Sequence, residues 1–195
     1  KVDCGVKAHV GSEAEKITEG LDNHEKRIEE YSKVGATFTK WRAVYKISNG
    51  CPSSQSIRSN AHALARYAAL VQEAKMVPII EPEVLMDGSH DINKCYHVTT
   101  DVLNECYNQL AIHKIDLKGT VLKPNMIIPG SGSSKKSSSE EIAQITLDRI
   151  KKGSQNCNPK QNLIPVEWQA VLDLRVSTAL VKLIPLRHDL SNRNL

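Results

Sequence analysis

The stretch Thr120-Val121-Leu122-Lys123-Pro124-Asn125-Met126 begins with a short apolar run that a single lysine, Lys123, closes. Three earlier charged residues, Lys1, Lys40 and Glu81, each stand at a strand-like segment as well. The four charged residues follow one another at intervals of about 40 residues. A strand with its crossover helix and connecting loops needs roughly 30 residues or more. The spacing therefore predicts successive βα units, each with a charge at the carboxyl end of its strand.

Polar residues also come in pairs, two positions apart, at each of these segments. The pairs are Lys1 with Asp3, Lys40 with Arg42, Glu81 with Glu83, and Lys123 with Asn125. Residues two apart on a strand share one face of the sheet. A parallel strand buried on both faces reads as an unbroken apolar run, so the pairs require a polar cavity on one side. The carboxyl-terminal mouth of a barrel provides such a cavity.

Each segment also has an ordinary structural explanation. A lysine that closes a strand is usually a solvated residue at the rim, and Glu81-Pro82-Glu83 could be a plain turn. In Lys40-Trp41-Arg42 a cation could simply lie against the indole ring. The regular spacing is what favours one shared site over four unrelated features.

Composition indicates an ordinary soluble domain. The 195 residues are 40% hydrophobic and 25% charged, which suffices for one sizeable core. No apolar run approaches the roughly 18 residues that suggest a membrane span, and the amino terminus lacks the pattern of a signal peptide. We therefore expect a cytoplasmic protein without membrane association. Because the first residue is Lys rather than Met, we also expect part of a longer chain.

The cysteines, histidines and net charge argue against metal and nucleic-acid ligands. The five cysteines are scattered without a Cys-x-x-Cys pair, which predicts reduced thiols rather than a disulfide framework or structural zinc. No two of the seven histidines lie four residues apart beside a carboxylate, so zinc-dependent catalysis is not expected. A net charge of +4 with few aromatic residues fits small phosphorylated ligands as well as nucleic acid, and we expect no nucleic-acid partner.

The hydrophobic pattern predicts alternating helices and strands. Helices are expected over residues 12–33, 53–75, 92–113 and 138–151, the last opened by a capping box of Ser138 and Glu141. Strands are expected over residues 36–41, 77–80 and 120–122, with a turn at 86–91. The serine- and glycine-rich stretch 130–137 indicates a linker loop rather than a phosphate cradle. Beyond Lys152 the alternation of predicted strands and helices ends, and the pattern of residues 166–184 is helical but ambiguous.

These segments together resemble the class I fructose-bisphosphate aldolase family. The resemblance covers roughly residues 1–151 and rests on Lys1-Val2-Asp3, Glu19-Gly20-Leu21-Asp22, Lys40-Trp41-Arg42, Leu64-Ala65-Arg66-Tyr67-Ala68, Val77-Pro78-Ile79-Ile80-Glu81-Pro82-Glu83, Asp87-Gly88-Ser89-His90-Asp91 and Leu122-Lys123-Pro124-Asn125-Met126.

The resemblance implies an α/β fold that forms part of a TIM (β/α)8 barrel. Residues 1–152 would supply about four βα units, matching strands three to six of the family, and residues 153–195 would be a divergent tail, either helical or poorly ordered. A complete barrel typically takes about 250 residues. The family's Ser-Gly-Gly phosphate loop on strand seven and its phosphate-binding arginine on strand eight have no counterpart here.

The resemblance also implies roles for seven residues. Lys123 would be the nucleophile that condenses with the substrate ketone, and neighbouring Lys40 would favour its neutral form. Glu81 would transfer protons and Glu83 would assist it. The remaining three contact substrate: Asp3 would orient or polarise hydroxyl groups, and Lys1 and Arg42, with Lys40, would hold phosphate and hydroxyl groups. This chemistry requires no metal and no cofactor.

Three functions remain open. The leading expectation is cleavage of fructose 1,6-bisphosphate to glycerone phosphate and glyceraldehyde 3-phosphate in glycolysis, by a protein that assembles as a tetramer, as the family commonly does. The second is a non-catalytic aldolase-like chain that is inert or acts through a binding or assembly partner. The third is another Schiff-base lyase acting on a different sugar phosphate.

Overall fold

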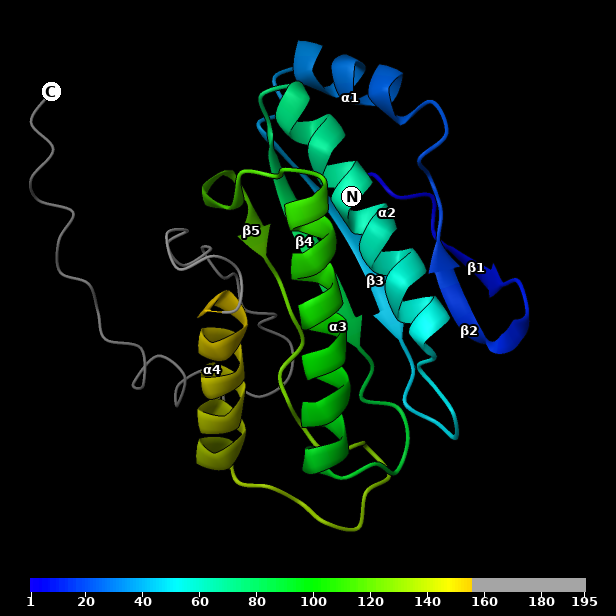
Figure 1. Cartoon of the computed structure of the whole chain (residues 1–195), viewed down its shortest axis with the longest axis vertical. Coiled ribbons are helices and arrows are strands. Elements are labelled where there is room, and N and C mark those ends of the chain that lie inside the picture. Colours follow the sequence, from blue (N-terminus) through cyan, green and yellow to red (C-terminus); the bar gives the residue numbers. More distant parts are fainter. Residues whose placement is uncertain (156–195) are drawn as a thin grey trace, which may run out of the picture.

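The structure, a computed structural model, describes residues 1–155, and a three-stranded parallel sheet forms the centre of this part (Figure 1). Its strands are β3 (Phe38–Tyr45), β4 (Val77–Val84) and β5 (Val121–Leu122), in that spatial order. Helix α2 (Ser54–Glu73) connects β3 to β4, and α3 (Ile92–Ile112) followed by a short 3-10 turn (Leu117–Gly119) connects β4 to β5. Helix α4 (Ser139–Gln155) follows β5. The prediction of an α/β fold with parallel strands is confirmed.

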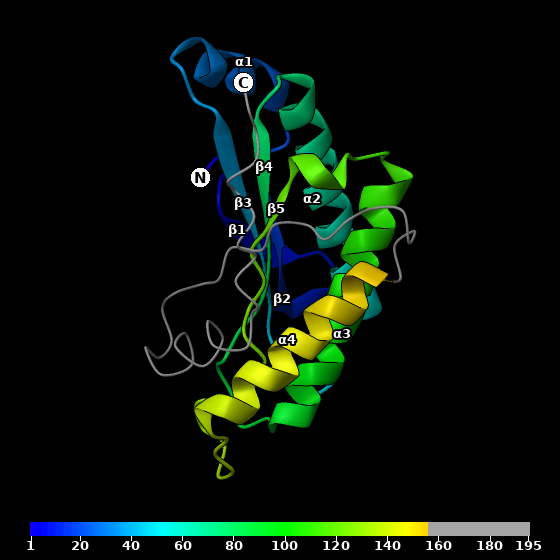
Figure 2. The same cartoon turned by 90° about the vertical axis from the view of Figure 1, so that its left-hand side faces the viewer.

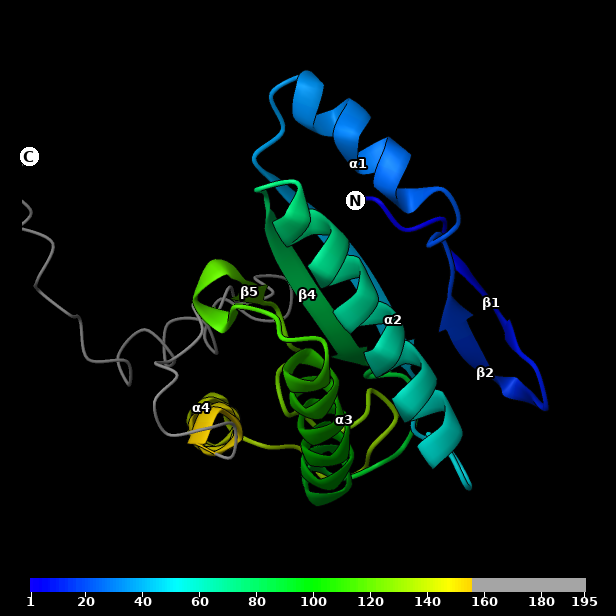
Figure 3. The same ribbon diagram turned by 45° about the horizontal axis from the view of Figure 1, so that its top comes forward.

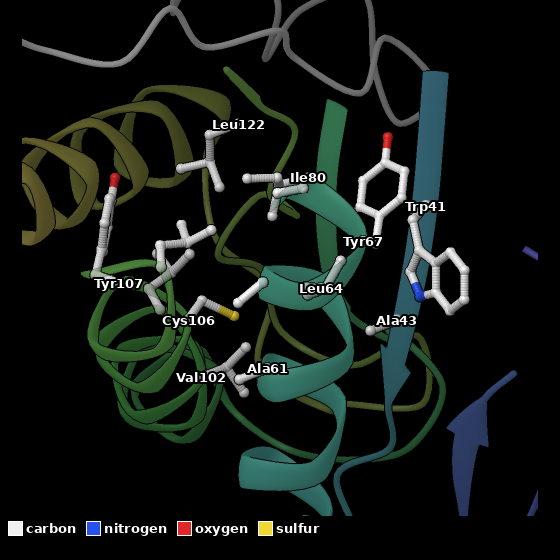
Figure 4. Packing of buried hydrophobic residues seen from close by; sticks show 14 of the residues in the cluster. Trp41, Ala43, Ala61, Leu64, Tyr67, Ile80, Val102, Cys106, Tyr107 and Leu122 are labelled. Atoms are coloured by element: carbon white, nitrogen blue, oxygen red, sulfur yellow. The ribbon is translucent and has the colours of Figure 1, made fainter. Parts of the chain in front are cut away.

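Helices α2 and α3 lie on one side of this sheet, and α4 lies beside α3 (Figures 2 and 3). Burial alternates along β3: every second residue, from Thr39 to Tyr45, is buried, whereas Lys40 and Arg42 on the opposite face are only partly covered. Figure 4 shows how the buried face packs against the two helices, with Trp41 against Tyr67 and Leu64, Ile80 and Val102 filling the space between. The apolar core thus occupies one face of the sheet and leaves the other face to polar side chains.

The predicted helix over residues 12–33 is wrong in its first half. Residues 6–18 form an antiparallel hairpin of β1 (Val6–His9) and β2 (Ser12–Thr18), and only α1 (His24–Lys33) is helical. Tertiary hydrogen bonds explain the difference: the side-chain amide of Asn60 donates to the carbonyl of Lys16 at 2.9 Å and accepts from the amide of Thr18 at 3.1 Å. Asn60 is fully buried in α2, so the hairpin is fixed by a residue far away in the sequence.

The strand ends also differ from the prediction. Strands β3 and β4 each run four residues beyond the predicted ends, to Tyr45 and Val84, so Lys40 and Glu81 lie inside their strands rather than at the carboxyl ends. Residues 1–5 form no strand; the amide of Val2 donates to the carbonyl of Lys40 at 2.9 Å and holds this segment beside β3. Three parallel strands are therefore present in residues 1–155, where four were predicted.

The starts of the three later helices agree well with the prediction. Ser53 caps α2 by accepting from the amide of Ser56 at 3.1 Å, and Ser138 accepts from the amide of Glu141 at 3.1 Å, as one half of a capping box does. Helix α4 continues to Gln155, past the predicted tail boundary at residue 153. The predicted helix at 166–184 lies outside the described residues. Among helices of residues 1–155, none combines the length and apolar character that a membrane span would need.

His24 gives the fold a pH dependence that can be measured. Its ring is almost completely buried, edge-on to Trp41 with centroids 5.5 Å apart. Burial, helped by the positive charge of Arg27, lowers the pKa of His24 from 6.5 to about 4. As the pH falls below 6.5 the unfolded chain is protonated first, so the stability that neutral His24 provides is lost between about pH 6.5 and pH 4.

We predict that lowering the pH from 7 to 5 reduces the unfolding free energy of the 195-residue chain by about 1–2 kcal/mol, because the unfolded chain takes up a proton on His24. The variant His24→Gln should lack that part of the pH dependence in urea unfolding, because glutamine does not titrate. The exposed His97→Gln serves as the matched control and should keep the wild-type slope. Identical slopes for wild type and His24→Gln would contradict the prediction.

Candidate active site

The carboxylate of Glu81 lies between two lysines on the polar face of the sheet. Its Oε1 is 2.5 Å from the Nζ of Lys123, and its Oε2 is 3.0 Å from the Nζ of Lys40. The Glu81 side chain is only 2% exposed, Lys123 is 15% exposed and Lys40 is 32% exposed. Strand register produces this meeting: Lys40 pairs with Ile79 on β4, and the amide of Lys123 donates to the carbonyl of Ile80. Three residues predicted to be catalytic are thereby brought together.

Arg42 and Glu83 form a second ion pair on the same face. The Nε of Arg42 donates to Oε2 of Glu83, and Arg42 is directly paired with Glu81 in the register of β3 and β4. The hydrogen bond from Arg42 to Glu83 raises the pKa of Arg42 despite partial burial, and the charges of Glu83, Glu81 and Asp3 add to this effect. Arg42 therefore interacts with all three carboxylates of the predicted site.

Lys1 and Asp3 form the third pair, with Nζ and Oδ1 3.1 Å apart. Asp3 is nearly buried, and its Oδ1 also accepts from the amide of Gly5 at 3.1 Å. Its Oδ2 is buried without a hydrogen-bond partner among the residues described. Lys1 is about half exposed. Asp3 thus presents an acceptor that a polar ligand could satisfy, next to a cation that solvent can reach.

Asn125 does not lie on the polar face of the sheet. Its position two residues after Lys123 had suggested that the two side chains would share that face. Its Oδ1 accepts from the amide of Val84 at 3.0 Å, and its Nδ2 donates to Thr99 Oγ1 at 3.1 Å. Strand β5 ends at Leu122, so the two-residue alternation no longer applies at position 125. Asn125 ties the end of β4 to α3 instead.

The loops that follow β4 and β5 are joined in a way that the sequence analysis missed. The amide of Gly130 donates to the carbonyl of His90 at 2.8 Å, and that of Gly132 donates to the carbonyl of Gly88 at 2.9 Å. A Cβ at Gly130 would lie 2.3 Å from the Gly88 carbonyl oxygen, so only glycine fits there. The start of the serine-rich stretch is thus anchored. The signal was Gly88 in one loop and Gly130 and Gly132 in the other, because glycine permits such close backbone approach.

His90 lies at this junction and had been assigned only to a turn. Both of its ring nitrogens are buried without hydrogen-bond partners within the described part of the chain. Burial lowers the pKa of His90, although the charge of Asp91 opposes the effect. The ring is therefore neutral at pH 7 and lies at the junction of the two loops.

The arrangement around Glu81 suits proton transfer to and from an amine. One carboxylate faces two ammonium groups, so this cluster carries one excess positive charge in a largely buried setting. Loss of one proton from a lysine removes that charge while keeping a hydrogen bond to the carboxylate. Such a lysine is a nucleophile with a proton carrier already in contact. In residues 1–155 no group of three or more His, Cys, Asp or Glu side chains could hold a metal ion.

Removing Glu81 should leave two partly buried ammonium groups facing each other. We predict that Glu81→Ala lowers the unfolding free energy of the 195-residue chain by about 1–3 kcal/mol, less than for a fully buried pair because both lysines reach solvent. Chemical denaturation measures this loss. When both lysines are first replaced, in the double variant Lys40→Met/Lys123→Met, Glu81→Ala should lower the unfolding free energy much less, because no ammonium groups remain to repel each other.

The matched control is Glu19→Ala, because Glu19 pairs with Lys7 on the surface, where both side chains are well exposed. That substitution should change stability by less than about 1 kcal/mol. An equal cost for Glu81→Ala in the wild-type and double-methionine backgrounds would show that the ion pairs do not explain the stability of this face.

Comparison with known proteins places the chain in a family. Residues 1–157 match the family described as fructose-bisphosphate aldolase class-I. The chain is 49% identical over 152 residues to cytosolic fructose-bisphosphate aldolase 4 of Arabidopsis thaliana, covering 78% of this chain and 39% of that one. It is 48% identical over 151 residues to a probable class 1 fructose-bisphosphate aldolase of Xanthomonas campestris pv. campestris, covering 77% and 45%.

A solved structure agrees with these relatives. The fructose-bisphosphate aldolase of Plasmodium falciparum, solved in complex with TRAP and a small-molecule inhibitor, superposes with a TM-score of 0.80 at 36% identity and covers 86% of this chain and 47% of that chain. The chain thus spans 39% to 45% of the length of these two curated relatives. On the family match, the identities and the shared fold together, the chain belongs to the class I fructose-bisphosphate aldolase family.

Proposed function

We propose that this chain carries the central catalytic strands of an aldolase that cleaves fructose 1,6-bisphosphate to glycerone phosphate and glyceraldehyde 3-phosphate. The observation that carries the proposal is the contact of Glu81 with both Lys123 and Lys40 on the polar face of the sheet. Membership of the family supports the reaction class, and the contact of an amine with a buried carboxylate supports the roles proposed below.

Lys123 is the nucleophile in this proposal. Its neutral amine adds to the ketone carbon of the substrate, giving a carbinolamine, and loss of water from the carbinolamine gives an iminium ion. The iminium withdraws electrons as the C4 hydroxyl gives its proton to a carboxylate of the site and the C3–C4 bond breaks, which releases the aldehyde product and leaves an enamine on Lys123. Protonation of the enamine carbon and addition of water then release glycerone phosphate and restore the amine.

Glu81 transfers the protons that these steps require. Carbinolamine formation and dehydration both need a group close to the nitrogen that can give and take a proton. The Oε1 of Glu81 is already 2.5 Å from the Nζ of Lys123. Lys40 holds the other carboxylate oxygen and keeps positive charge next to the reacting amine. Glu83 assists Glu81 indirectly in this proposal, by holding Arg42 on the same face.

The remaining charged residues bind substrate. Asp3 would accept a hydrogen bond from a substrate hydroxyl through its unpartnered Oδ2. Lys1 is half exposed and Arg42 is partly exposed, so both could turn towards phosphate groups, to which guanidinium and ammonium groups bind by charge-assisted hydrogen bonds. The steps use no metal and no cofactor.

We also propose the finer architecture and setting that the family implies. Residues 1–152 correspond to strands three to six of a (β/α)8 barrel, with the polar face of the sheet turned towards the barrel interior. The first of these strands would be the segment at Lys1–Asp3, held beside β3 by the hydrogen bond from Val2 to Lys40. The protein is proposed to be cytoplasmic and tetrameric, without nucleic-acid or membrane partners.

Borohydride trapping tests the proposal. The purified 195-residue chain is incubated with fructose 1,6-bisphosphate, reduced, and mapped by mass spectrometry. We predict a reduced adduct on Lys123 that is absent from Lys123→Met and retained in the matched control Lys118→Met, because Lys118 is an exposed residue outside the site. Glu81→Gln should slow adduct formation by about 100-fold or more, as expected for loss of a proton-transfer group.

A full-length relative labelled in parallel verifies the trapping conditions. No adduct on this chain, with the relative labelled, would favour the alternative that the chain is a non-catalytic aldolase-like protein. An adduct with a different sugar phosphate but not with fructose 1,6-bisphosphate would favour another Schiff-base lyase.

A further inference from the structure

Two histidines lie together on the outer surface of the helices, on the side of the sheet away from Lys123. His62 is an exposed residue of α2, and His113 is the partly buried residue that caps the carboxyl end of α3. Their ring centroids are 5.0 Å apart, and the ring planes are inclined by 62°. The proposed catalysis uses neither residue.

The hydrogen bonds around His62 define its tautomer. Gln109 Nε2 lies 2.9 Å from Glu105 Oε1, and a carboxylate only accepts, so the amide nitrogen of Gln109 must face Glu105. The other end of this amide, Oε1, is then the atom that lies 3.2 Å from His62 Nδ1. An amide oxygen cannot donate, so His62 Nδ1 carries the hydrogen and donates it. The Nε2 atom of neutral His62 therefore has a free lone pair.

His113 is held in the same tautomer by a different oxygen. Its Nδ1 lies 2.9 Å from the backbone carbonyl oxygen of Gln109, which can only accept. His113 Nδ1 consequently donates, and the Nε2 lone pair of neutral His113 is free as well. One residue, Gln109, thus orients both imidazoles through its side chain and its backbone.

This pattern is the one that metal-binding histidines show. A ligating histidine usually donates its other ring N–H to a carbonyl or carboxylate, which fixes the tautomer and the ring orientation. With metal–nitrogen distances of about 2.0–2.1 Å and tetrahedral angles, two imidazoles on one ion have ring centroids about 5 Å apart. The observed spacing of 5.0 Å matches that value, and it also matches an ordinary edge contact between two rings, so the tests below are chosen to separate the two.

The carboxyl end of α3 also favours a cation. His113 lies at the carboxyl end of α3, where the last carbonyl groups of a helix give a partial negative charge. The carboxylate of Glu105 is linked to the His62 ring through the side chain of Gln109. Glu105 Oε1 accepts from Gln109 and lies 3.7 Å from Arg58 Nε. Glu105 therefore acts through Gln109 rather than as a direct ligand.

We propose that His62 and His113 form a surface site for a divalent transition-metal ion such as Ni²⁺, Cu²⁺ or Zn²⁺. The two Nε2 atoms are the protein ligands, and water completes the coordination. Imidazole suits these ions, whereas Mg²⁺ and Ca²⁺ prefer oxygen. Gln109 is a positioning residue in this site. The site is independent of the aldolase chemistry, so each can fail without the other.

Ni²⁺ is the probe for the first test, because it is well suited to imidazole. Calorimetric titration of the untagged 195-residue chain at pH 7.5 should show one saturable site. His62→Gln and His113→Gln should each weaken binding at least tenfold, and Gln109→Ala should weaken it by about tenfold through loss of ring orientation. The matched control is His97→Gln, an exposed histidine on the same helix as His113, which should bind as wild type.

Nitrogen NMR of the histidine rings in the metal-free chain provides a second test that does not depend on binding. Both rings should show the tautomer protonated at Nδ1. In the Gln109→Ala variant, only the His62 ring should lose this preference. The proposal is overturned if either ring is protonated at Nε2, or if the His62 and His113 variants bind Ni²⁺ as wild type does. A loss of binding in His97→Gln as large as in these variants would equally overturn it, because it would show binding by scattered surface histidines.

Discussion

The buried carboxylate of Glu81 is the constraint on which the polar face of the sheet depends. A carboxylate that is 2% exposed is costly unless it is paired, and here each oxygen faces an ammonium group. Because the two lysines come from β3 and from the end of β5, the pairing also fixes how the outer strands stand relative to β4. The same contact that makes the buried charge tolerable places a carboxylate against the amine of Lys123.

The two faces of the sheet perform different tasks. The face towards α2 and α3 is apolar and nearly solvent-free, with Trp41 and Ile80 of the sheet packed beneath Tyr67 of α2 (Figure 4). The opposite face carries the three ion-pair groups and is partly open. A rigid apolar layer on one side holds the charged side chains on the other side in register, which is the general requirement for a preorganised site. The two-residue alternation of the strands thus separates stability from chemistry.

Much of this arrangement could be predicted from the sequence, because it follows from local periodicity. The spacing of Lys40, Glu81 and Lys123 predicted parallel strands that bring these residues together, and the helix caps at Ser53 and Ser138 were recognisable. The hairpin was not predictable in this way, since Asn60 fixes it from a distant helix. Asn125 was misplaced because strand β5 ends before the alternation reaches it. The ion-pair partners also required coordinates, since sequence pattern gives the face of a side chain but not its contacts.

The central proposal is that the cluster of Glu81, Lys40 and Lys123 holds Lys123 as the amine that reacts with the substrate ketone. Competitive labelling with a trace of acetic anhydride tests it most directly, with the acetylation of every lysine compared in the presence and absence of fructose 1,6-bisphosphate. We predict that the sugar phosphate protects Lys123 from acetylation and leaves the acetylation of exposed Lys118 unchanged. Equal acetylation of Lys123 with and without the sugar phosphate would contradict the account.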